Sequence, residues 1–413
     1  MLFPFPHRPT EPPRVVITGA GIVTALGMGW DVNAAGFRIG RRAFRPVTAF
    51  DASRQRVKVA AEVDLPAKLP DTRLSRRQEQ RLDRAARQLL LASVECWQQA
   101  GWETTGNLPL VLGTTSGGMT LGEEFLKHAQ GNPNGNRRQP TRVAHYQCQR
   151  QALLIMEALG FSGPLTIVAN ACASGANSIG HAFDLIRAGR AERVLTGGFD
   201  GLSELVFAGF DSLQALSLTG CRPFAADRDG LGLGEGAAVM ALETLASARR
   251  RRANILGELV GYGAATDGHH LTQPHPNGDA ALRSMTEACR VAKLSPAQID
   301  YLNAHGTGTP LNDGAEANAI NRWAGGDVGQ IKVSSTKASI GHLLGAAGSV
   351  EAVLCLMALQ GQWLPPTVPT ETVDPLCQFE FITKSRDAKV DHVLTNSFGF
   401  GGANASLIFR RWV

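Results

Sequence analysis

Residues 165–175 read LTIVANACASG, and within this stretch the character of the chain changes from strand to helix around Cys172. Residues 165–169 have the apolar character of a buried strand, and the segment after Cys172 has helical spacing. A cysteine at such a junction lies beside the free N–H groups that begin a helix. Their partial positive charge favours the thiolate and offers donors to an oxyanion. The position therefore predicts a nucleophile, although a lone cysteine is more commonly a small buried residue.

Two later segments shift the balance toward a nucleophile. Residues 303–310 (NAHGTGTP) and 337–348 (KASIGHLLGAAG) each place a histidine after a short strand-like run, among residues too small to fill a core. His305 and His342 therefore have room for a ligand beside them. Zinc held by these histidines and Cys172 would lack the closely spaced ligand pairs typical of zinc proteins, so we expect no metal.

Residues 15–27 (VVITGAGIVTALG) resemble a dinucleotide-binding turn, but the pattern is incomplete. Thr24 occupies the place of the third glycine, and no acidic residue ends a plausible second strand about 20 residues later. We predict a tight strand-to-helix turn here instead.

The bulk composition narrows the functional class. With 413 residues and a formal charge of +5, the chain is long enough for two fused domains and is only modestly basic. Its aromatic residues do not alternate with basic ones, which argues against nucleic-acid binding. Seven scattered cysteines indicate reduced thiols in a cytoplasmic enzyme. We expect the proline-rich N-terminus not to act as a signal peptide, because it has no sustained apolar core. No uninterrupted apolar run reaches the roughly 18 residues of a membrane span, so we also expect no membrane association.

Strand-like and helical runs alternate along the whole chain, which predicts an α/β protein with a mostly parallel sheet covered by helices. The expected strands are 14–19, 111–113, 165–169, 194–198, 255–260, 299–302 and 331–334. The expected helices are 76–100, 149–159, 174–189, 280–292, 315–323 and 343–359. The pattern begins again after the arginine run 249–252, and residues 337–339 faintly echo residues 172–174.

With these motifs in order, the chain resembles the β-ketoacyl-acyl carrier protein synthases of the elongating type, which have a Cys-His-His triad and a thiolase fold. The resemblance extends from residues 15–21 to residues 396–404 (NSFGFGGAN) and so covers nearly the whole chain. It implies two similar halves in a five-layered αβαβα arrangement. We divide them into residues 1–253, which carry the nucleophile, and residues 254–413, which carry the histidines.

The resemblance also implies roles for individual residues. Cys172 would take the acyl group, and His305 and His342 would stabilise the enolate that decarboxylation of a malonyl thioester produces. Lys337 would pair with a carboxylate such as Glu351. The gate and oxyanion hole would consist of Cys172, Phe398, Gly399, Phe400, Gly401, Gly402 and Asp267. The pantetheine arm would contact Thr307 and Thr309, and the acyl chain would contact Ser116 and Phe210.

The implied partner is an acyl carrier protein, which brings the phosphopantetheine, so no separate cofactor is expected. Its docking site would include Arg76, Arg77, Arg137 and Arg138. A degradative thiolase would have a second cysteine in residues 396–404, and an initiating synthase would have asparagine in place of His342. Two questions stay open from the sequence: a homodimer or a heterodimer with a cysteine-less homologue, and a fatty acid or a specialised polyene or polyketide product.

Overall fold

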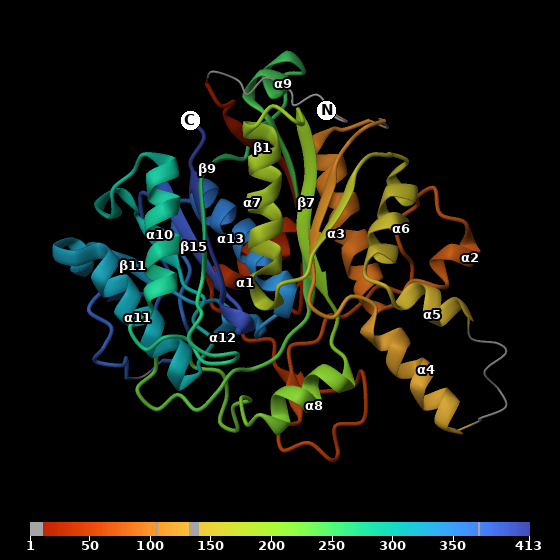
Figure 1. Ribbon diagram of the computed structural model, residues 1–413, viewed down its shortest axis with the longest axis horizontal. Helices are drawn as coiled ribbons and strands as arrows, with labels where there is room; N and C mark the ends of the chain where they lie inside the picture. Colours follow the sequence, from red (N-terminus) through yellow and green to blue (C-terminus); the bar gives the residue numbers. More distant parts are fainter. Residues whose placement is uncertain (1–10, 104–105, 132–139, 371) are drawn as a thin grey trace.

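The protein has two groups of strands on either side of a central pair of helices, as Figure 1 shows for the computed structural model. The structure describes residues 11–103, 106–131, 140–370 and 372–413. The elements before residue 254 are β1 (Val15–Thr24), β2 (Gly27–Met28), α1 (Trp30–Arg38), β3 (Arg45–Pro46), β4 (Val59–Ala60), α2 (Arg76–Glu79), α3 (Arg84–Ala100), β5 (Leu110–Gly113), α4 (Met119–Gly131), α5 (Pro140–Tyr146), α6 (Gln149–Leu159), β6 (Leu165–Val168), η2 (Ala171–Ala173), α7 (Ser174–Arg187), β7 (Arg193–Asp200), α8 (Glu204–Ser212), β8 (Gly236–Thr244) and α9 (Leu245–Arg250).

The elements after residue 254 are β9 (Gly257–Thr266), α10 (Asp279–Ala292), η3 (Pro296–Gln298), β10 (Tyr301–Asn303), α11 (Pro310–Ala324), η4 (Gly325–Gln330), β11 (Lys332–Ser334), α12 (Lys337–Ile340), η5 (Leu344–Ala346), α13 (Ala347–Gly361), β12 (Trp363–Leu364), β13 (Glu380–Phe381), β14 (Arg386–Asp387), β15 (His392–Phe398), η6 (Phe400–Gly402) and β16 (Ala403–Arg410).

The strand order repeats between the two halves. The main sheet runs β13-β11-β10-β15-β16-β9-β1-β8-β7-β5-β6. Counted outward from the centre, β1, β8, β7, β5 and β6 in the first half match β9, β16, β15, β10 and β11 in the second. In the sheet, the strands of the two halves are joined where residues Val15 to Ile17 of β1 pair with residues Gly257 to Leu259 of β9. The predicted similarity of the halves is therefore present in the topology, while the boundary at residue 253 stays a prediction.

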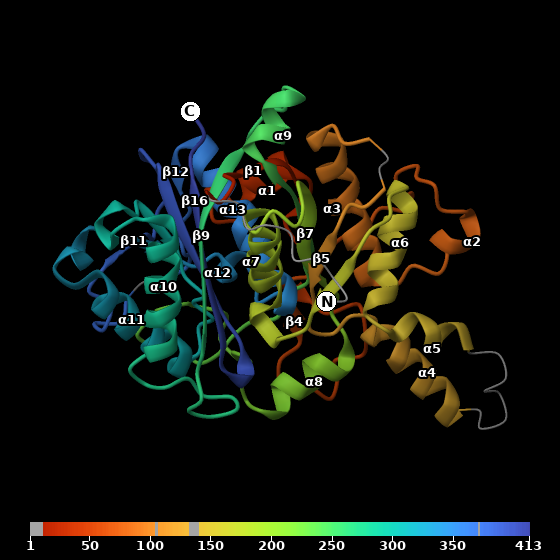
Figure 2. The same ribbon diagram turned by 45° about the horizontal axis from the view of Figure 1, so that its top comes forward.

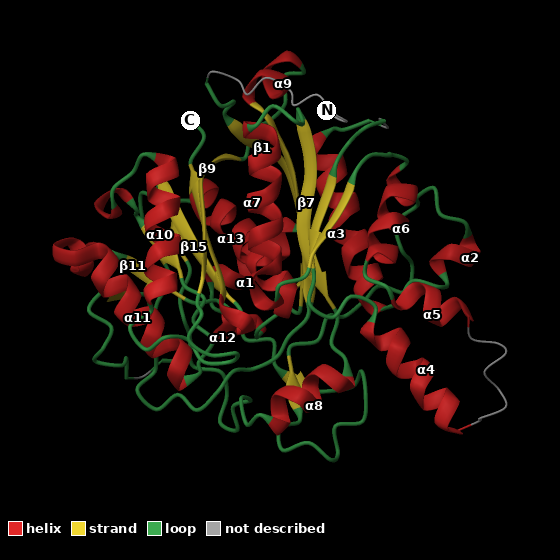
Figure 3. Cartoon of the chain, viewed as in Figure 1, coloured by secondary structure: helices red, strands yellow, loops and turns green. Residues whose placement is uncertain are grey.

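Helices form three layers around these strands. α3 and α6 cover the outer face of the first half, α10 and α11 cover the outer face of the second, and α7 and α13 pack between the two groups of strands. Figure 3 shows the same alternation of helix and strand layers. This is the predicted αβαβα thiolase fold.

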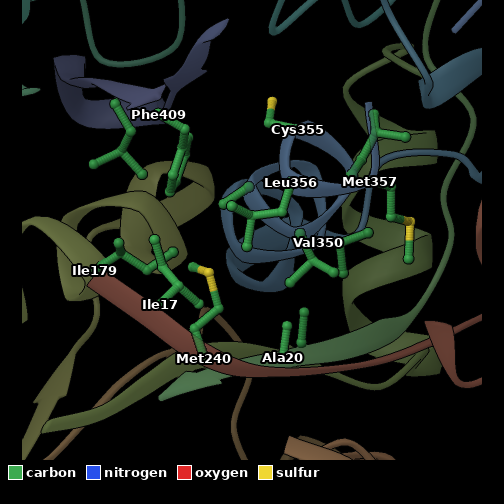
Figure 4. Packing of buried hydrophobic residues seen from close by; sticks show 14 of the residues in the cluster. Ile17, Ala20, Ile179, Met240, Val350, Cys355, Leu356, Met357 and Phe409 are labelled. Carbon is green, nitrogen blue, oxygen red and sulfur yellow. The ribbon is translucent and has the colours of Figure 1, made fainter. Parts of the chain in front are cut away.

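The middle layer contains the most apolar helix of the chain. Every residue of α13 from Ala347 to Leu359 is buried, and its only charged side chain is Glu351. Figure 4 shows Val350 and Leu356 of α13 packed among side chains of β1, β8, α7 and β16. The stretch Leu344–Gly361 is long and apolar enough to cross a membrane, but 89% of it is buried inside the protein. It is therefore placed as a core helix.

Several sequence-based predictions were wrong in detail. The sheet is not mostly parallel: only its outer strands are, and the pairings from β15 through β7 are antiparallel. Residues 15–24 are one continuous strand rather than a tight turn. Positions 19 and 21 of this strand accept only glycine, because α3 packs closely against them. A Cβ at either position would lie within 2.4 Å of a backbone oxygen of that helix. The helix predicted over 76–100 is split into α2 and α3.

Candidate active site

Cys172 lies in the turn between β6 and α7, as predicted. Ala171 has a left-handed φ of 58°, and this reversal lets the chain pass from strand to helix within a few residues. The Ser174 hydroxyl donates to the Ala171 carbonyl at 2.6 Å and accepts the Asn170 N–H at 2.9 Å. These two hydrogen bonds hold the turn, and Cys172 is left only 6% exposed.

The charge state of Cys172 differs from our expectation of a favoured thiolate. Burial raises the pKa of the thiol to about 11. The Lys337 ammonium and the backbone N–H groups of Phe400 and Cys172 oppose this rise without cancelling it. The resting side chain is therefore a neutral thiol at neutral pH. The two N–H groups are those predicted to form the oxyanion hole, and both lie at the sulfur.

His305 follows β10 and is held by a carboxylate from α11. Glu316 accepts the N–H groups of His305 and Gly306, each at 2.8 Å. The Lys337 Nζ donates to the His305 carbonyl at 2.6 Å and lies 3.4 Å from Nδ1 of the same residue. Burial, and secondly the Lys337 charge, hold the pKa of His305 well below its usual value. The imidazole is therefore neutral, and an ammonium facing Nδ1 favours a proton on Nε2.

His342 lies after α12 and has the same charge state. Its Nδ1 accepts the Leu344 N–H at 3.2 Å, which places the ring proton on Nε2. Burial and Lys337 hold its pKa well below the usual value. The His342 and His305 rings lie 5.3 Å apart and are nearly perpendicular, at 85°. The two neutral imidazoles therefore form a pair of N–H donors.

The ion pair predicted between Lys337 and Glu351 is present and buried. The two side chains are 1% and 3% exposed. Burial raises the pKa of Glu351, and the Lys337 ammonium opposes that rise. Because this cation lies behind both histidines, it disfavours a second positive charge on either ring.

The predicted gate consists of two loops bonded to each other. Asp267 N–H donates to the Gly402 carbonyl at 2.8 Å, and Gly401 N–H donates to the Leu271 carbonyl at 2.7 Å. Gly402 has φ 81°, and a Cβ there would lie 1.9 Å from the Asp267 oxygen. The Phe400 ring stacks on Phe210 with centroids 5.9 Å apart. Two backbone hydrogen bonds therefore hold the loops together, and their movement as a gate stays a prediction.

One cavity of about 430 Å³ brings most of the predicted site together. The predicted residues that line it are Cys172, Phe210, Asp267, His305, Thr307, Thr309, His342, Phe398, Gly399, Phe400 and Gly402. Lys337 and Glu351 lie behind the histidines rather than in the lining. The hydroxyls of Thr307 and Thr309 are 2.9 Å apart at the side of the cavity where α11 begins.

Other predicted residues do not join this cavity. Ser116 is buried and does not line this cavity; its hydroxyl donates to Asp200 at 2.7 Å, and its contact with an acyl chain stays a prediction. Arg76 and Arg77 are exposed on α2. Figures 1 and 2 place α2 beside α6, at the opposite edge of the molecule from α11. Arg137 and Arg138 lie outside the described residues.

Sequence reasoning missed three buried carboxylates that hold the site. Asp200 accepts the N–H groups of Thr115, Ser116 and Gly345 and so connects the two halves; burial raises its pKa. Asp313 and Glu316 accept N–H groups of the turn that carries His305. Two acidic residues three apart in the first turns of a helix, directly after a glycine-rich loop, were the available signal.

Comparison with known proteins identifies the family. Residues 13–248 match the beta-ketoacyl synthase N-terminal domain, and residues 256–371 match the beta-ketoacyl synthase C-terminal domain. A 3-oxoacyl-[acyl-carrier-protein] synthase 2 from Synechocystis sp. is 37% identical over 415 residues, covering 97% of this chain and 99% of the relative. The chain therefore belongs to the β-ketoacyl synthase family.

Solved structures agree with this assignment. "The ishigamide ketosynthase/chain length factor" has a TM-score of 0.91 and 31% identity, with 97% of this chain and 100% of that chain covered. A type II PKS acyl-carrier protein in complex with its ketosynthase has a TM-score of 0.86 and 26% identity, with the same coverage. The protein is thus an acyl-transferring enzyme of the thiolase fold.

Proposed function

We propose that this protein catalyses the decarboxylative condensation of an acyl thioester with malonyl-acyl carrier protein to give a 3-oxoacyl-acyl carrier protein. One observation carries the proposal: Cys172 and two neutral imidazoles share a single cavity, beside two backbone N–H groups at the cysteine sulfur. A nucleophile, donors for an enolate and donors for a tetrahedral oxyanion are the three requirements of that reaction.

The first half-reaction transfers the acyl group. The Cys172 sulfur attacks the thioester carbonyl, and the oxyanion of the tetrahedral intermediate accepts the N–H groups of Cys172 and Phe400. The carrier thiolate leaves as the intermediate collapses, and the proton of the Cys172 thiol ends on it. No net charge is left in the buried site, which suits a thiol whose resting state is neutral.

The second half-reaction forms the carbon–carbon bond. The malonyl carboxylate leaves as CO2, and the resulting enolate oxygen accepts the Nε2–H groups of His305 and His342. The enolate carbon attacks the acyl-cysteine carbonyl, and the departing Cys172 thiolate takes a proton from solvent. Neutral imidazoles suit this role because an imidazolium would bind the malonyl carboxylate and oppose its loss.

The partner in both steps is an acyl carrier protein, whose phosphopantetheine arm supplies the thioester, so the proposal needs no separate cofactor. Thr307 and Thr309 are positioned to contact that arm. A complex of a carrier protein with its ketosynthase among the structural neighbours supports this partnership. A cytoplasmic location remains part of the proposal.

A second candidate is that this chain is the catalytic subunit of a heterodimer. The similarity to a ketosynthase/chain length factor structure favours it, and the presence of Cys172 assigns this chain to the catalytic side. The strand β6 next to the nucleophile is at the edge of the sheet, with half-buried side chains, and offers a surface for either partner. The mass and subunit composition of the purified complex, measured with and without a cysteine-less homologue, separate homodimer from heterodimer.

The test of the proposed reaction follows the acyl group. Incubation with an acyl-carrier protein or acyl-pantetheine, followed by peptide mass spectrometry, should place the acyl group on Cys172. Addition of malonyl-carrier protein should then release CO2 and yield a 3-oxoacyl product two carbons longer. An adduct confined to another of the seven cysteines, or full condensing activity in Cys172→Ala, would contradict the proposal.

A further inference from the structure

A buried arginine lies beside the turn that, in the proposed function, contacts the pantetheine arm. Residues 307–310, which we call the threonine turn, lead into α11 and supply Thr307, Thr309 and Pro310 to the cavity lining. Arg228 does not line the cavity, and its side chain is only 8% exposed. An arginine is seldom buried without a paired charge, and no step of the proposed reaction uses this one. The contacts of Arg228 therefore indicate its role.

Arg228 contacts both ends of the threonine turn. At one end, its Nε lies 3.8 Å from Oδ2 of Asp313. The Asp313 carboxylate in turn accepts the N–H groups of Thr307, at 3.0 Å, and Gly308, at 3.1 Å. At the other end, Nη2 of Arg228 donates to the Pro310 carbonyl at 3.2 Å. One side chain thus holds the turn directly at its last residue and, through a carboxylate, at its first.

Two carboxylates share this one guanidinium. Nη1 of Arg228 donates to Asp374 at 2.5 Å and to the Ala225 carbonyl at 2.9 Å. The Asp313 and Asp374 side chains are 0% and 17% exposed, and among the described residues neither has another basic group within 4.0 Å. Removal of the cation would leave a buried negative charge without a counter-charge. The charge of Asp313, which holds the Thr307 N–H, therefore depends on Arg228.

The hydroxyl groups of the threonine turn move with its backbone. Those of Thr307 and Thr309 lie 2.9 Å apart, and the Thr309 N–H donates to the Thr307 hydroxyl at 3.3 Å. Gly308, between them, has φ 83°, and a Cβ there would lie 2.7 Å from the Gly230 oxygen. The turn is therefore packed closely against the loop that carries Arg228. A shift of that loop would displace both hydroxyls together.

We propose that Arg228 is a positioning residue for the pantetheine arm: it fixes the threonine turn so that the hydroxyls of Thr307 and Thr309 meet the amides of the arm. A displaced turn would lose these hydrogen bonds while the surroundings of Cys172 stay unchanged. This inference rests on the proposed function, since it needs a substrate carried on pantetheine. It gives Arg228 no part in either chemical step.

The experiment compares two donors that differ in the arm. Octanoyl-pantetheine and the S-ethyl thioester of octanoate carry the same acyl group, and the second has no arm. Arg228 is replaced by Gln, which removes the charge, and by Lys, which keeps it. Arg222→Gln is the matched control, because Arg222 lies in the same loop and pairs with Asp227 at 2.8 Å. Acylation of Cys172 is followed by mass spectrometry over a range of donor concentrations, so that KM and the maximum rate are measured separately.

Arg228→Gln should raise the KM for octanoyl-pantetheine by about tenfold, the usual order for the loss of one or two hydrogen bonds. Its maximum rate, and both constants for the ethyl thioester, should stay close to the wild-type values. Arg228→Lys should raise the same KM by about threefold, since an ammonium keeps the charge but cannot reach all the partners of a guanidinium. Arg222→Gln should behave as the wild type. Wild-type KM values in both Arg228 variants, or an equal change with both donors, would overturn the inference.

A double-mutant cycle tests whether Arg228 acts through the two threonines. In a protein that carries Thr307→Val and Thr309→Val the hydroxyls are absent, so adding Arg228→Gln should not raise the KM further. A full additional rise would overturn the inference. Partial unfolding cannot imitate the expected result, because KM does not depend on the amount of active enzyme. Absence of Cys172 acylation of the wild type by both donors would instead contradict the proposed function itself.

Discussion

In the first half of the molecule, residues 171–175 (ACASG) begin with Ala171 at φ 58° and pass through η2 into α7. In the second half, residues 344–348 (LGAAG) begin with Leu344 at φ 52° and pass through η5 into α13. Both segments place a non-glycine residue in the left-handed region directly before a helical turn. The two central helices therefore begin in the same way, and the segments correspond in structure.

The difference lies at the second position, where Cys172 corresponds to Gly345. A side chain at Gly345 has no space, because a Cβ there would lie 2.6 Å from the Thr115 nitrogen and 2.8 Å from Asp200. Its N–H donates instead to Asp200 at 2.7 Å. One helix start thus presents a nucleophile, while the other uses its N–H groups to position His342 and a buried carboxylate. The two corresponding turns therefore differ in use: one carries the candidate nucleophile, and the other supports the site.

Removing the Cys172 side chain should have the largest effect on activity. Cys172→Ala should lower condensing activity by about 10³-fold or more, since no other group in the cavity takes the acyl chain. Because both histidines remain, the variant should still release CO2 from malonyl-carrier protein. Adduct mass spectrometry and CO2 assays measure the two functions separately. Loss of CO2 release together with acylation would show that the turns do not divide their roles in this way.

Changing the histidines should have the opposite result: decarboxylation should be lost while acylation of Cys172 is retained. His305→Ala and His342→Ala should each lower decarboxylation by about 10²–10³-fold, the typical effect of losing one oxyanion donor. Acylation of Cys172 should remain measurable in both. Near-normal CO2 release from both variants would remove the enolate role from the pair.

At Gly345, in the second turn, even a small side chain should destabilise the protein. Gly345→Ala forces a methyl group against the Thr114 and Thr115 backbone and should destabilise the protein by about 1–3 kcal/mol, as overpacking of a core does. Cys172→Ala, at the corresponding position, removes atoms rather than adding them and serves as its control. Denaturant unfolding of both variants measures the difference. Equal stabilities would mean that the loop containing Thr115 moves away at no cost.

Removing the backbone strain at Ala171 should have a smaller effect on stability. Ala171→Gly should stabilise the protein by about 1 kcal/mol or less, because glycine adopts a positive φ without the clash of a Cβ. The variant leaves the Cys172 side chain in place, so the shift of the unfolding midpoint measures the cost of the positive φ at residue 171. A clear loss of stability would show that the Ala171 methyl group contributes packing that outweighs the strain.

Acid should change the decarboxylation rate least of all. The folded pKa values of His305 and His342 lie well below the unfolded value of about 6.5, so the rings stay neutral from about pH 8 to pH 6. The rate of CO2 release should be flat over that range. Stability should change in a different window: below about pH 6.5 the unfolded chain binds protons that the folded chain does not, so stability falls as the pH drops. A titration of either imidazole near 6.5, followed by NMR of the ring protons, would contradict neutral, buried imidazoles.

Several features of the site could be predicted from short stretches of sequence. A cysteine between a strand and a helix, and two histidines among small residues, are local patterns that a reader finds without knowing the fold. The Lys337–Glu351 pair was predicted from the family resemblance, and the structure places Glu351 as the only charged side chain of an otherwise apolar helix. The echo that we placed at residues 337–339 was wrong, because residues 344–348 occupy the corresponding turn.

By itself the sequence determined the family and the thiolase fold, through motifs spread along the chain. It also gave Cys172, His305 and His342 as the candidate catalytic residues, because each stands in a local pattern of residue type and spacing. The tertiary structure alone decided the antiparallel centre of the sheet, the neutral thiol of Cys172 and the carboxylates of Asp200 and Glu316. It also left Ser116, Arg76 and Arg77 out of the cavity lining. These features depend on burial and on contacts between residues far apart in the chain, and both exist only once the two halves have packed together.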